Sequence, residues 1–234
     1  MKETPTFIYA MTPAGATSFK NFFEAGPVKE LLEKPGELRY SGWDLNTRDQ
    51  VKIVKGEYLE LRNGERKLIR LYEDGALIVR VDASEDFLGW GRGDVEFKQK
   101  PRLNPVAVIE FTYNFVNLCS KLVKFLHPKP NTVGIRVEIR NAFFENSKLY
   151  MIPYGTGTTA WHFDDEQYKA PEASVIREID VSIDELTSRP DIVAYSLVQK
   201  IYAWFGISSE KIPYVSAEGD KKFVDSQKII NSKP

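Results

Sequence analysis

The sequence has little of what metal and redox chemistry use. It contains one cysteine, Cys119, and two histidines, His127 and His162. A single cysteine excludes an internal disulfide and fits a reducing compartment. A structural zinc site needs four nitrogen or sulfur ligands, usually in close pairs, and these three residues cannot supply them. The composition therefore predicts a chain without a disulfide framework or a structural zinc site.

Long apolar runs and an excess of one charge are missing as well. No stretch approaches the roughly 18 to 20 apolar residues that a membrane helix requires, and the start, MKETPTFIYAM, lacks the pattern of a signal peptide. With 32 basic and 33 acidic residues the formal net charge is −1, whereas nucleic-acid-binding modules usually show a clear basic excess. We therefore expect a cytoplasmic protein without a membrane partner. A nucleic-acid partner has no support from the net charge, although a sum does not reveal a local basic patch.

The size and composition are those of a soluble globular protein. The chain has 234 residues, of which 42% are hydrophobic and 28% charged, enough for one large core or two small ones. We expect a single α+β domain over residues 1–215 and a polar, flexible tail over residues 216–234. A subdivision near residue 101 is the alternative, because the segment GRGDVEFKQKPR resembles a linker between two domains.

The segment Tyr58–Val81 predicts three consecutive strands. Asn63-Gly64 and Asp74-Gly75 stand where the chain must reverse, and both pairs are typical of type I′ turns, which require positive φ. Four arginines alternate with many of the apolar residues: Arg62, Arg66, Arg70 and Arg80. They predict a basic solvent face where a polyanion or an acidic partner would bind, with a merely solvated sheet as the alternative interpretation.

Two long helices complete the expected fold. Asn104 is placed to cap the first, Pro105 stands at its first position, and two apolar seams run from there to His127. Such a helix is mostly buried, with only a narrow polar strip: Glu110, Asn114, Asn117, Lys121 and Lys124. The second helix covers Pro190–Phe205, with Gly206 as its C′ residue. We expect an α+β fold in which both helices pack on a largely antiparallel sheet.

Shorter patterns predict the remaining elements. Alternation and apolar runs predict strands at Thr6–Met11, Val133–Ile139 and Ser174–Val181, and Lys148–Pro153 is expected to lie antiparallel to Val133–Ile139. Pro27–Lys34 predicts a short helix. Another helix is expected to begin at Thr17 or Ser18 and to contain three aromatic residues: Phe19, Phe22 and Phe23.

One strand carries a catalytic pattern that can be tested. Asp94, Glu96 and Lys98 match the D-x-E-x-K core of metal-dependent nucleases, in which two carboxylates hold Mg²⁺ and the lysine helps to activate water. Those enzymes usually draw the first aspartate from an earlier strand, a role open to Asp82 or Asp86, and Glu110 is a further candidate ligand. A Mg²⁺-dependent nuclease is therefore the alternative function. The plain interpretation is an amphipathic edge strand.

Other patterns predict less chemistry. His162, Asp164 and Asp165 are the residues of a mixed metal site, or of a solvated acidic loop. The glycine-rich segments 89–93 and 155–159 match neither a P-loop nor GxGxxG, so ordinary loops are expected. Anion binding by their backbone amides, assisted by Arg92 in the first segment, is the alternative. Cys119 lies between the apolar residues of a helix, where an inert thiol is expected. Apart from the alternative set Asp94, Glu96 and Lys98, the sequence therefore predicts no catalytic residue, and it predicts no cofactor.

Tryptophans in predicted loops are the best interaction candidates. Trp90 and Trp161 lie in such loops, where a large indole anchors the loop or faces a partner. Trp204 follows helical spacing and is expected in the core. We therefore predict a protein partner that contacts these positions: Trp90, Arg92, Trp161, Arg70 and Arg80. The oligomeric state is left open.

Four segments together resemble a bacterial family. In order they are RLYEDGALIVRV, FLGWGR, NPVAVIEFTYNFVNL and VAYSLVQKIYAWFG. They are similar to the region that follows the Schlafen-type, AlbA-like DNA-binding domain in some bacterial proteins, over most of the chain from Phe7 to Tyr214. The AlbA-like domain itself starts with an E-x-K motif, and Glu96–Lys98 lacks its context. The resemblance implies a regulatory or partner-binding accessory module, with no catalytic residues to carry over.

Overall fold

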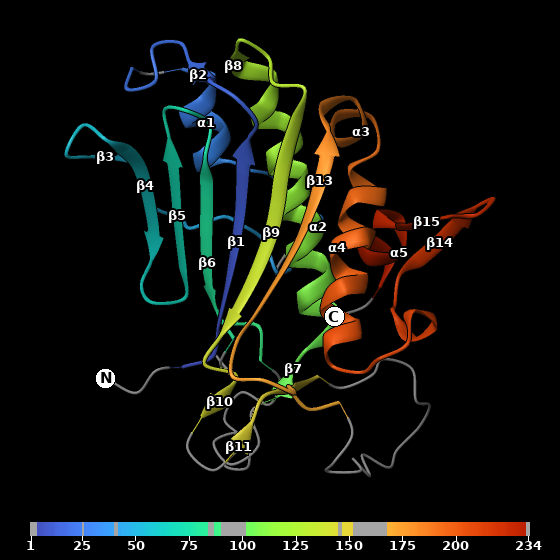
Figure 1. Cartoon of the computed structure of the whole chain (residues 1–234). Coiled ribbons are helices and arrows are strands. Elements are labelled where there is room, and N and C mark those ends of the chain that lie inside the picture. The colour runs from blue at the N-terminus through green and yellow to red at the C-terminus, as the bar shows by residue number, and fades with distance from the viewer. Residues whose placement is uncertain are drawn as a thin grey trace.

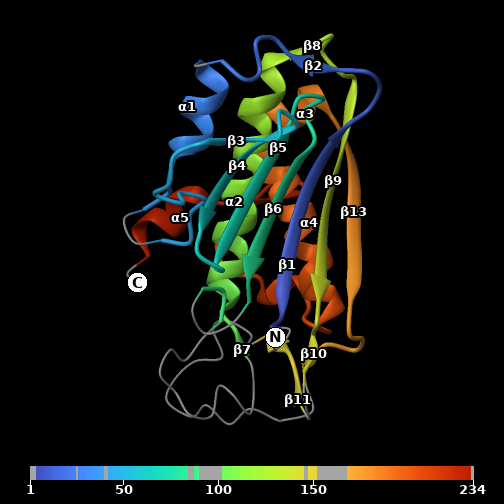
Figure 2. The same cartoon turned by 90° about the vertical axis from the view of Figure 1, so that its left-hand side faces the viewer.

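The structure, a computed structural model, is built around one antiparallel sheet. It describes residues 4–24, 26–39, 42–83, 87–89, 102–144, 147–151 and 168–232. The strands of the sheet are β1 (Thr6–Pro13), β3 (Lys52–Val54), β4 (Tyr58–Asn63), β5 (Lys67–Tyr72), β6 (Leu77–Asp82), β9 (Thr132–Arg140) and β13 (Val175–Ser182). They lie in the order β13-β9-β1-β6-β5-β4-β3. Helices α2 (Pro105–Leu122) and α4 (Pro190–Trp204) cover one face of this sheet (Figures 1 and 2), which confirms the expected α+β fold.

The first strand of the chain lies near the centre of the sheet. Phe7 of β1 is opposite Val81 of β6 on one side and opposite Ile139 of β9 on the other. Its apolar side chains Phe7, Tyr9 and Met11 are fully buried. Strands from before and after residue 101 therefore belong to the same sheet, and a boundary near residue 101 would divide it.

The predicted meander is confirmed, but its turns differ from the prediction. Gly64 has φ 51° and Gly75 has φ 90°, whereas Asn63 and Asp74 do not have positive φ. Both connections are longer than two residues, so neither is a type I′ turn. At the second connection Tyr72 N–H donates to Ala76 O at 2.9 Å and Gly75 N–H donates to Tyr72 O at 3.0 Å. Each glycine alone supplies the positive φ that its reversal requires.

Gly75 is also required by its close surroundings. A Cβ atom there would lie 2.7 Å from Leu126 Cδ2 and 2.9 Å from Pro13 Cγ. We expect Gly75→Ala to lower the free energy of unfolding by about 1–3 kcal/mol, through strained backbone and overpacking together, as measured by urea denaturation. Gly64→Ala is the matched control, because its φ is also positive but no atom lies within 4 Å of the added Cβ. Equal losses in the two variants would contradict the steric part of this explanation.

Helix α2 is largely buried and packs directly on the sheet. The Asn104 side chain caps it by accepting bonds from Val106 N–H at 3.0 Å and Ala107 N–H at 3.4 Å. Phe111 and Phe115 pack on Tyr9 of the sheet, with ring centroids 5.3 and 5.2 Å from its ring. With the turn η2 (Val123–Phe125), α2 is the one described helix that is long and apolar enough to cross a membrane, but 83% of that window is buried inside the protein. That burial is typical of a core helix.

Three polar residues of α2, Glu110, Asn114 and Lys121, contact the residues 34–39 and 42–51, which we call the connector. Arg39 of the connector donates to Glu110 Oε2 from Nε at 3.1 Å and from Nη2 at 3.0 Å. Asn114 Nδ2 donates to Trp43 O, and Lys121 Nζ donates to Pro35 O, both at 3.1 Å. The side chain of Glu110 is only 1% exposed. These polar residues therefore hold the connector against the helix.

A second buried cation ties the connector to the sheet. Lys67, at the start of β5, is 5% exposed and donates to Asp44 O and Asp44 Oδ1, each at 3.1 Å, and to Asn46 O. Burial lowers the pKa of Lys67, against the raising effect of the Asp44 carboxylate. The connector is thus held from α2 and from β5 by side chains that satisfy its backbone carbonyls.

Two predicted elements are wrong. In place of a helix at Phe19, the strand β2 (Ser18–Phe19) pairs with β8 (Leu126–His127), and Phe19 N–H donates to Glu73 O at 2.9 Å. The expected partner of β9 at Lys148 is replaced by β13, eight residues long. The segment around Lys148 instead forms short pairs: β10 (Phe143–Phe144) with β11 (Ser147–Lys148), and β12 (Tyr150–Met151) in parallel with β7 (Arg102–Leu103).

The C-terminal segment, expected to be a flexible tail, has regular structure. Strands β14 (Val215–Glu218) and β15 (Lys221–Val224) form a hairpin, and α5 (Ser226–Asn231) follows. Val224 and Ile229 are buried in the core, which a polar composition around them does not reveal. The remaining elements are α1 (Pro27–Glu33), α3 (Ile183–Ser188) and η3 (Ser209–Lys211).

Candidate functional site

The candidate site is the face of the sheet opposite α2 and α4, which we call the open face. Side chains alternate along a strand, so Ile8 and Ala10 point away from the helices while their buried neighbours point toward them. Figure 2 looks onto this face, and no described helix lies across it. Its central residues are Ile8, Ala10, Tyr58, Glu60, Arg62, Leu68, Arg70, Tyr72, Ile78 and Arg80.

The centre of the open face is apolar. Ala10 of β1 lies opposite Ile78 of β6, Ile8 lies beside them on β1, and Leu68 belongs to the next strand. Ala10 is 4% exposed, whereas the three larger side chains are partly exposed. Antiparallel sheets often leave one face to solvent, and the residues on that face are then usually polar. Arg80 lies opposite both Ile8 and Leu68, so the centre combines apolar side chains with an arginine, a mixture that protein interfaces use.

Arginines lie beside these apolar residues and, at Arg80, between them, and each is paired with a carboxylate. Glu60 accepts from Arg62 Nε at 2.6 Å and from Arg70 Nε at 2.8 Å. These hydrogen bonds, that of Arg62 first, hold the pKa of Glu60 below its usual value, and Glu60 raises the pKa of both guanidinium groups. Arg80 lies 3.3 Å from Glu65. The predicted basic face is therefore partly neutralised.

Two tyrosines extend the meander side of the open face. The rings of Tyr58 and Tyr72 lie on adjacent strands with centroids 5.3 Å apart. The Arg70 guanidinium lies 4.9 Å from the centroid of the Tyr58 ring, a cation–π contact. Arg70 is 31% exposed and Arg80 is 44% exposed, so both retain N–H donors toward solvent. Oriented arginines and tyrosines beside an apolar centre can bind a protein surface without large loss of side-chain entropy.

The other side of the open face is more acidic. On β9 and β13 it presents Arg136, Glu138, Arg140, Glu178 and Asp180. Glu138 accepts from Arg140 Nε at 2.6 Å and raises the pKa of that arginine. The charge of the open face thus changes across the sheet, from three arginines, Glu60 and Asp82 on β4–β6 to an acidic edge at β13.

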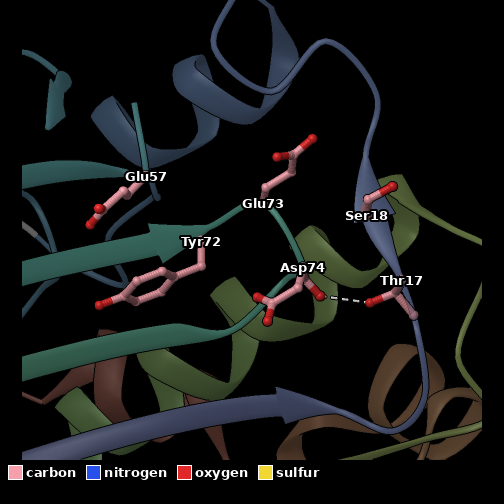
Figure 3. A pocket seen from close by; sticks show the side chains of 6 residues that line it. All are labelled: Thr17, Ser18, Glu57, Tyr72, Glu73 and Asp74. Carbon is pink, nitrogen blue, oxygen red and sulfur yellow. Dashed lines mark hydrogen bonds between the residues drawn. The ribbon is translucent and has the colours of Figure 1, made fainter. Parts of the chain in front are cut away.

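A hollow at one end of the sheet collects polar side chains but forms no chemical site. It has a volume of about 420 Å³ and is lined by Thr17, Ser18, Glu57, Tyr72, Glu73 and Asp74. Figure 3 shows that its three carboxylates, those of Glu57, Glu73 and Asp74, do not converge on one point, and Thr17 Oγ1 donates to Asp74 O at 2.6 Å. Among the residues that the structure describes, no group of three histidine, cysteine or acidic side chains is placed to hold a metal ion.

The described candidates for chemistry do not come together. Burial raises the pKa of the Cys119 thiol well above its usual value, and the residue is fully buried, as expected for an inert thiol. Asp82 shares the open face with Arg80 by alternation along β6, whereas Glu110 lies on the helix that covers the opposite face and is paired with Arg39. Glu110 is therefore not free to join Asp82 as a metal ligand.

Most predicted site residues lie outside the part of the chain that the structure describes. They are Asp86, Trp90, Arg92, Asp94, Glu96, Lys98, Trp161, His162, Asp164 and Asp165. The roles proposed for them from the sequence stay predictions. Of the predicted partner-binding residues, the structure places Arg70 and Arg80, which lie on adjacent strands of the open face.

Sequence reasoning missed the apolar centre. Ile8 and Ala10 belong to a run of apolar residues that predicts a buried strand, with no sign that one of its sides faces outward. The signal that was present lies in the meander, where Leu68 and Ile78 stand two residues before Arg70 and Arg80, in phase with these arginines and out of phase with the buried side chains. Comparisons with protein-family models, with curated proteins and with solved structures find no match to this chain.

Proposed function

We propose that the chain is a non-enzymatic binding domain that recognises a protein partner through the open face of its sheet. The observation that carries this proposal is the apolar centre at Ile8, Leu68 and Ile78, beside the oriented arginines Arg70 and Arg80. Interface centres are enriched in aromatic residues and arginine and depleted in lysine and acidic residues. The proposal agrees with the resemblance to a regulatory accessory module of bacterial cytosolic proteins.

The charge of the face favours a protein over a nucleic acid. Arg62 and Arg70 share the carboxylate of Glu60, and Arg80 lies beside Glu65. Binding to nucleic acid draws its affinity mainly from positive charges that neutralise phosphates, and here these charges are partly neutralised within the protein. A protein surface with apolar side chains and a few carboxylates fits the open face better. Its apolar side chains would contact the apolar residues of the face, and its carboxylates would accept bidentate hydrogen bonds from the arginines.

A double substitution tests this proposal. We expect Leu68→Glu combined with Ile78→Glu to reduce the recovery of the partner in affinity purification, quantified by mass spectrometry, by about ten-fold or more. The reason is that two charges would then have to be desolvated at the centre of the interface. Ile53→Glu is the matched control, because Ile53 is 49% exposed and points to the other side of the sheet.

Thermal unfolding verifies that both variants remain folded. A loss confined to the Leu68 and Ile78 variant supports the open face as the binding surface. Recovery that survives this double substitution, or that falls equally with Ile53→Glu, contradicts it. Loss of the recovered proteins on nuclease treatment would show that nucleic acid, not protein, is the bound partner.

A further inference from the structure

We propose that the free edge of β13 captures an extended segment of a partner protein as an additional antiparallel strand, and that this segment carries basic residues at alternate positions. Among the described residues, strand β13 is the last strand of the sheet and pairs on one side only, with β9. Figure 2 shows it at the border of the sheet with no described element beyond it. The surface differs from the centre of the open face and does not depend on the function proposed for it.

The backbone of β13 has hydrogen-bonding groups directed outward. Ile183 N–H donates to Asn131 O at 3.0 Å, which sets the phase of the ladder. Residues in phase with Ile183 therefore bond to β9, and the alternate residues Ile176, Glu178 and Asp180 direct N–H and C=O groups away from it. Among the described residues, the one bond to these groups is that of Arg177 Nη1 to Ile176 O, at 3.1 Å. A partner strand needs only to displace this exposed side chain.

The two edges of the sheet differ in how well they are protected against pairing with a strand of another chain. The opposite edge, β3, has three residues and carries Lys52, whose side chain is 64% exposed. Short strands with lysine are a common protection of an edge. Strand β13 has eight residues and pairs with β9 in one continuous register from Val175 to Ser182, without a bulge. It also exposes Ile176 by 51%. Its length and regularity make it a suitable template for strand addition.

The side chains of β13 disfavour a second copy of the same strand. Antiparallel pairing of two such edges through their outward groups places Glu178 opposite Glu178, Glu178 opposite Asp180, or Asp180 opposite Asp180, depending on the register. The neighbouring register, with Glu178 opposite Ile176, places Arg177 opposite Arg177. Like charges directly opposite each other are destabilising in sheets. Each central register of self-pairing therefore carries such a pair.

The same side chains define the partner. A residue opposite Glu178 and a residue opposite Asp180 would both be basic, because opposite charges across a strand pair are stabilising. The residue between them would face Ile179, which is partly buried on the helix side, and would be apolar. The partner segment therefore has the pattern basic, apolar, basic in an extended conformation.

A blocked peptide with lysine-valine-lysine at its centre and threonine on both sides is the probe. We expect saturable binding at millimolar peptide or below, followed by NMR through amide shifts along β13. The combination of Glu178→Lys and Asp180→Lys is expected to weaken this binding at least about ten-fold and to create binding of the glutamate-valine-glutamate peptide. Binding of both peptides with equal affinity, or of neither at millimolar concentration, overturns the proposal.

Glu178→Pro tests the backbone part of the proposal. Its N–H points outward, so proline removes a donor for the added strand without removing a bond to β9. We expect this variant to lose binding of the lysine peptide. Unchanged binding would show that the peptide attaches through charge alone and would overturn strand addition. The combined lysine variant decides the outcome even where Glu178→Pro fails to fold. Leu68→Glu is expected to leave peptide binding unchanged, which separates this proposal from the one for the open face.

Discussion

Replacing Arg39 by alanine is expected to lower the free energy of unfolding by about 3–5 kcal/mol, because it leaves the buried charge of Glu110 without its cation. The Glu110 side chain is 1% exposed and its Oε2 accepts two bonds from Arg39. The other oxygen of this carboxylate, Oε1, is buried and has no hydrogen-bond partner among the described residues. Arg39 also donates to Ser232 O and Ser232 Oγ. Urea denaturation measures the loss.

Two variants serve as controls for this result. Arg62→Ala removes an arginine that is 49% exposed and paired with Glu60, and a surface pair of this kind contributes about 0–1 kcal/mol. Arg39→Ala combined with Glu110→Leu removes both buried charges and is expected to be more stable than Arg39→Ala alone. A double variant less stable than the single one would contradict the role of Glu110 as an uncompensated buried charge.

The same pair predicts how the loss depends on pH. Burial raises the pKa of Glu110 above its usual value, against the lowering effect of Arg39. A carboxyl whose pKa is higher in the folded state contributes stability that is present below the unfolded pKa and lost as pH rises through the folded pKa. Without Arg39 that pKa rises further. We therefore expect the deficit of Arg39→Ala to be larger near about pH 8 than near about pH 5. A deficit independent of pH would contradict this role of the carboxylate.

Phe115→Ala is expected to lower the free energy of unfolding by about 3–5 kcal/mol, since it removes a large ring and leaves a cavity between helix and sheet. Phe115 is fully buried on α2, and its ring lies 5.2 Å from that of Tyr9 at the centre of the sheet. The neighbouring Phe111 ring also contacts Tyr9, so the remaining side chains have little freedom to fill the space. Chemical denaturation at equilibrium gives the value.

Phe143→Ala is the matched control for Phe115→Ala. Phe143 is 40% exposed and its ring contacts the Lys148 ammonium at 4.6 Å. The same atoms are removed in both variants, but those of Phe143 are already partly in water. We expect a loss of less than about 1 kcal/mol for this control. Similar losses for the two variants would contradict the packing of α2 on β1.

The parts of the fold that were predictable are those that local sequence determines. The meander has its reversals at glycines, and α2 has its cap and its two apolar seams within a single segment. The pairing of β1 with β9 and of β9 with β13 joins residues far apart in the chain, and no local pattern reports it. Ser18–Phe19 was predicted as helix because its spacing is helical, whereas its backbone bonds to distant residues.

The candidate site was predictable only in its charges. Arg70 and Arg80 alternate with apolar residues, so their place on a solvent face follows from the strand period. The role of Glu60 as the common counterion of Arg62 and Arg70 depends on the register of β4 against β5. Ile8 and Ala10 join the surface only because β1 lies beside β6. This surface could therefore be predicted only with knowledge of the order of the strands in the sheet, which no local sequence pattern reports.

The central position of β1 has a consequence for synthesis of the chain on the ribosome. Residues 6–13 emerge before both strands that flank them: β6 follows at residues 77–82, and β9 closes the other side of β1 at residues 132–140. Until then a nascent chain has a sheet with a bare inner edge. Exposed edges of this kind are where nascent chains aggregate or bind chaperones. The synthesis of residues 82 to 140 is therefore the period of translation in which this sheet most needs protection.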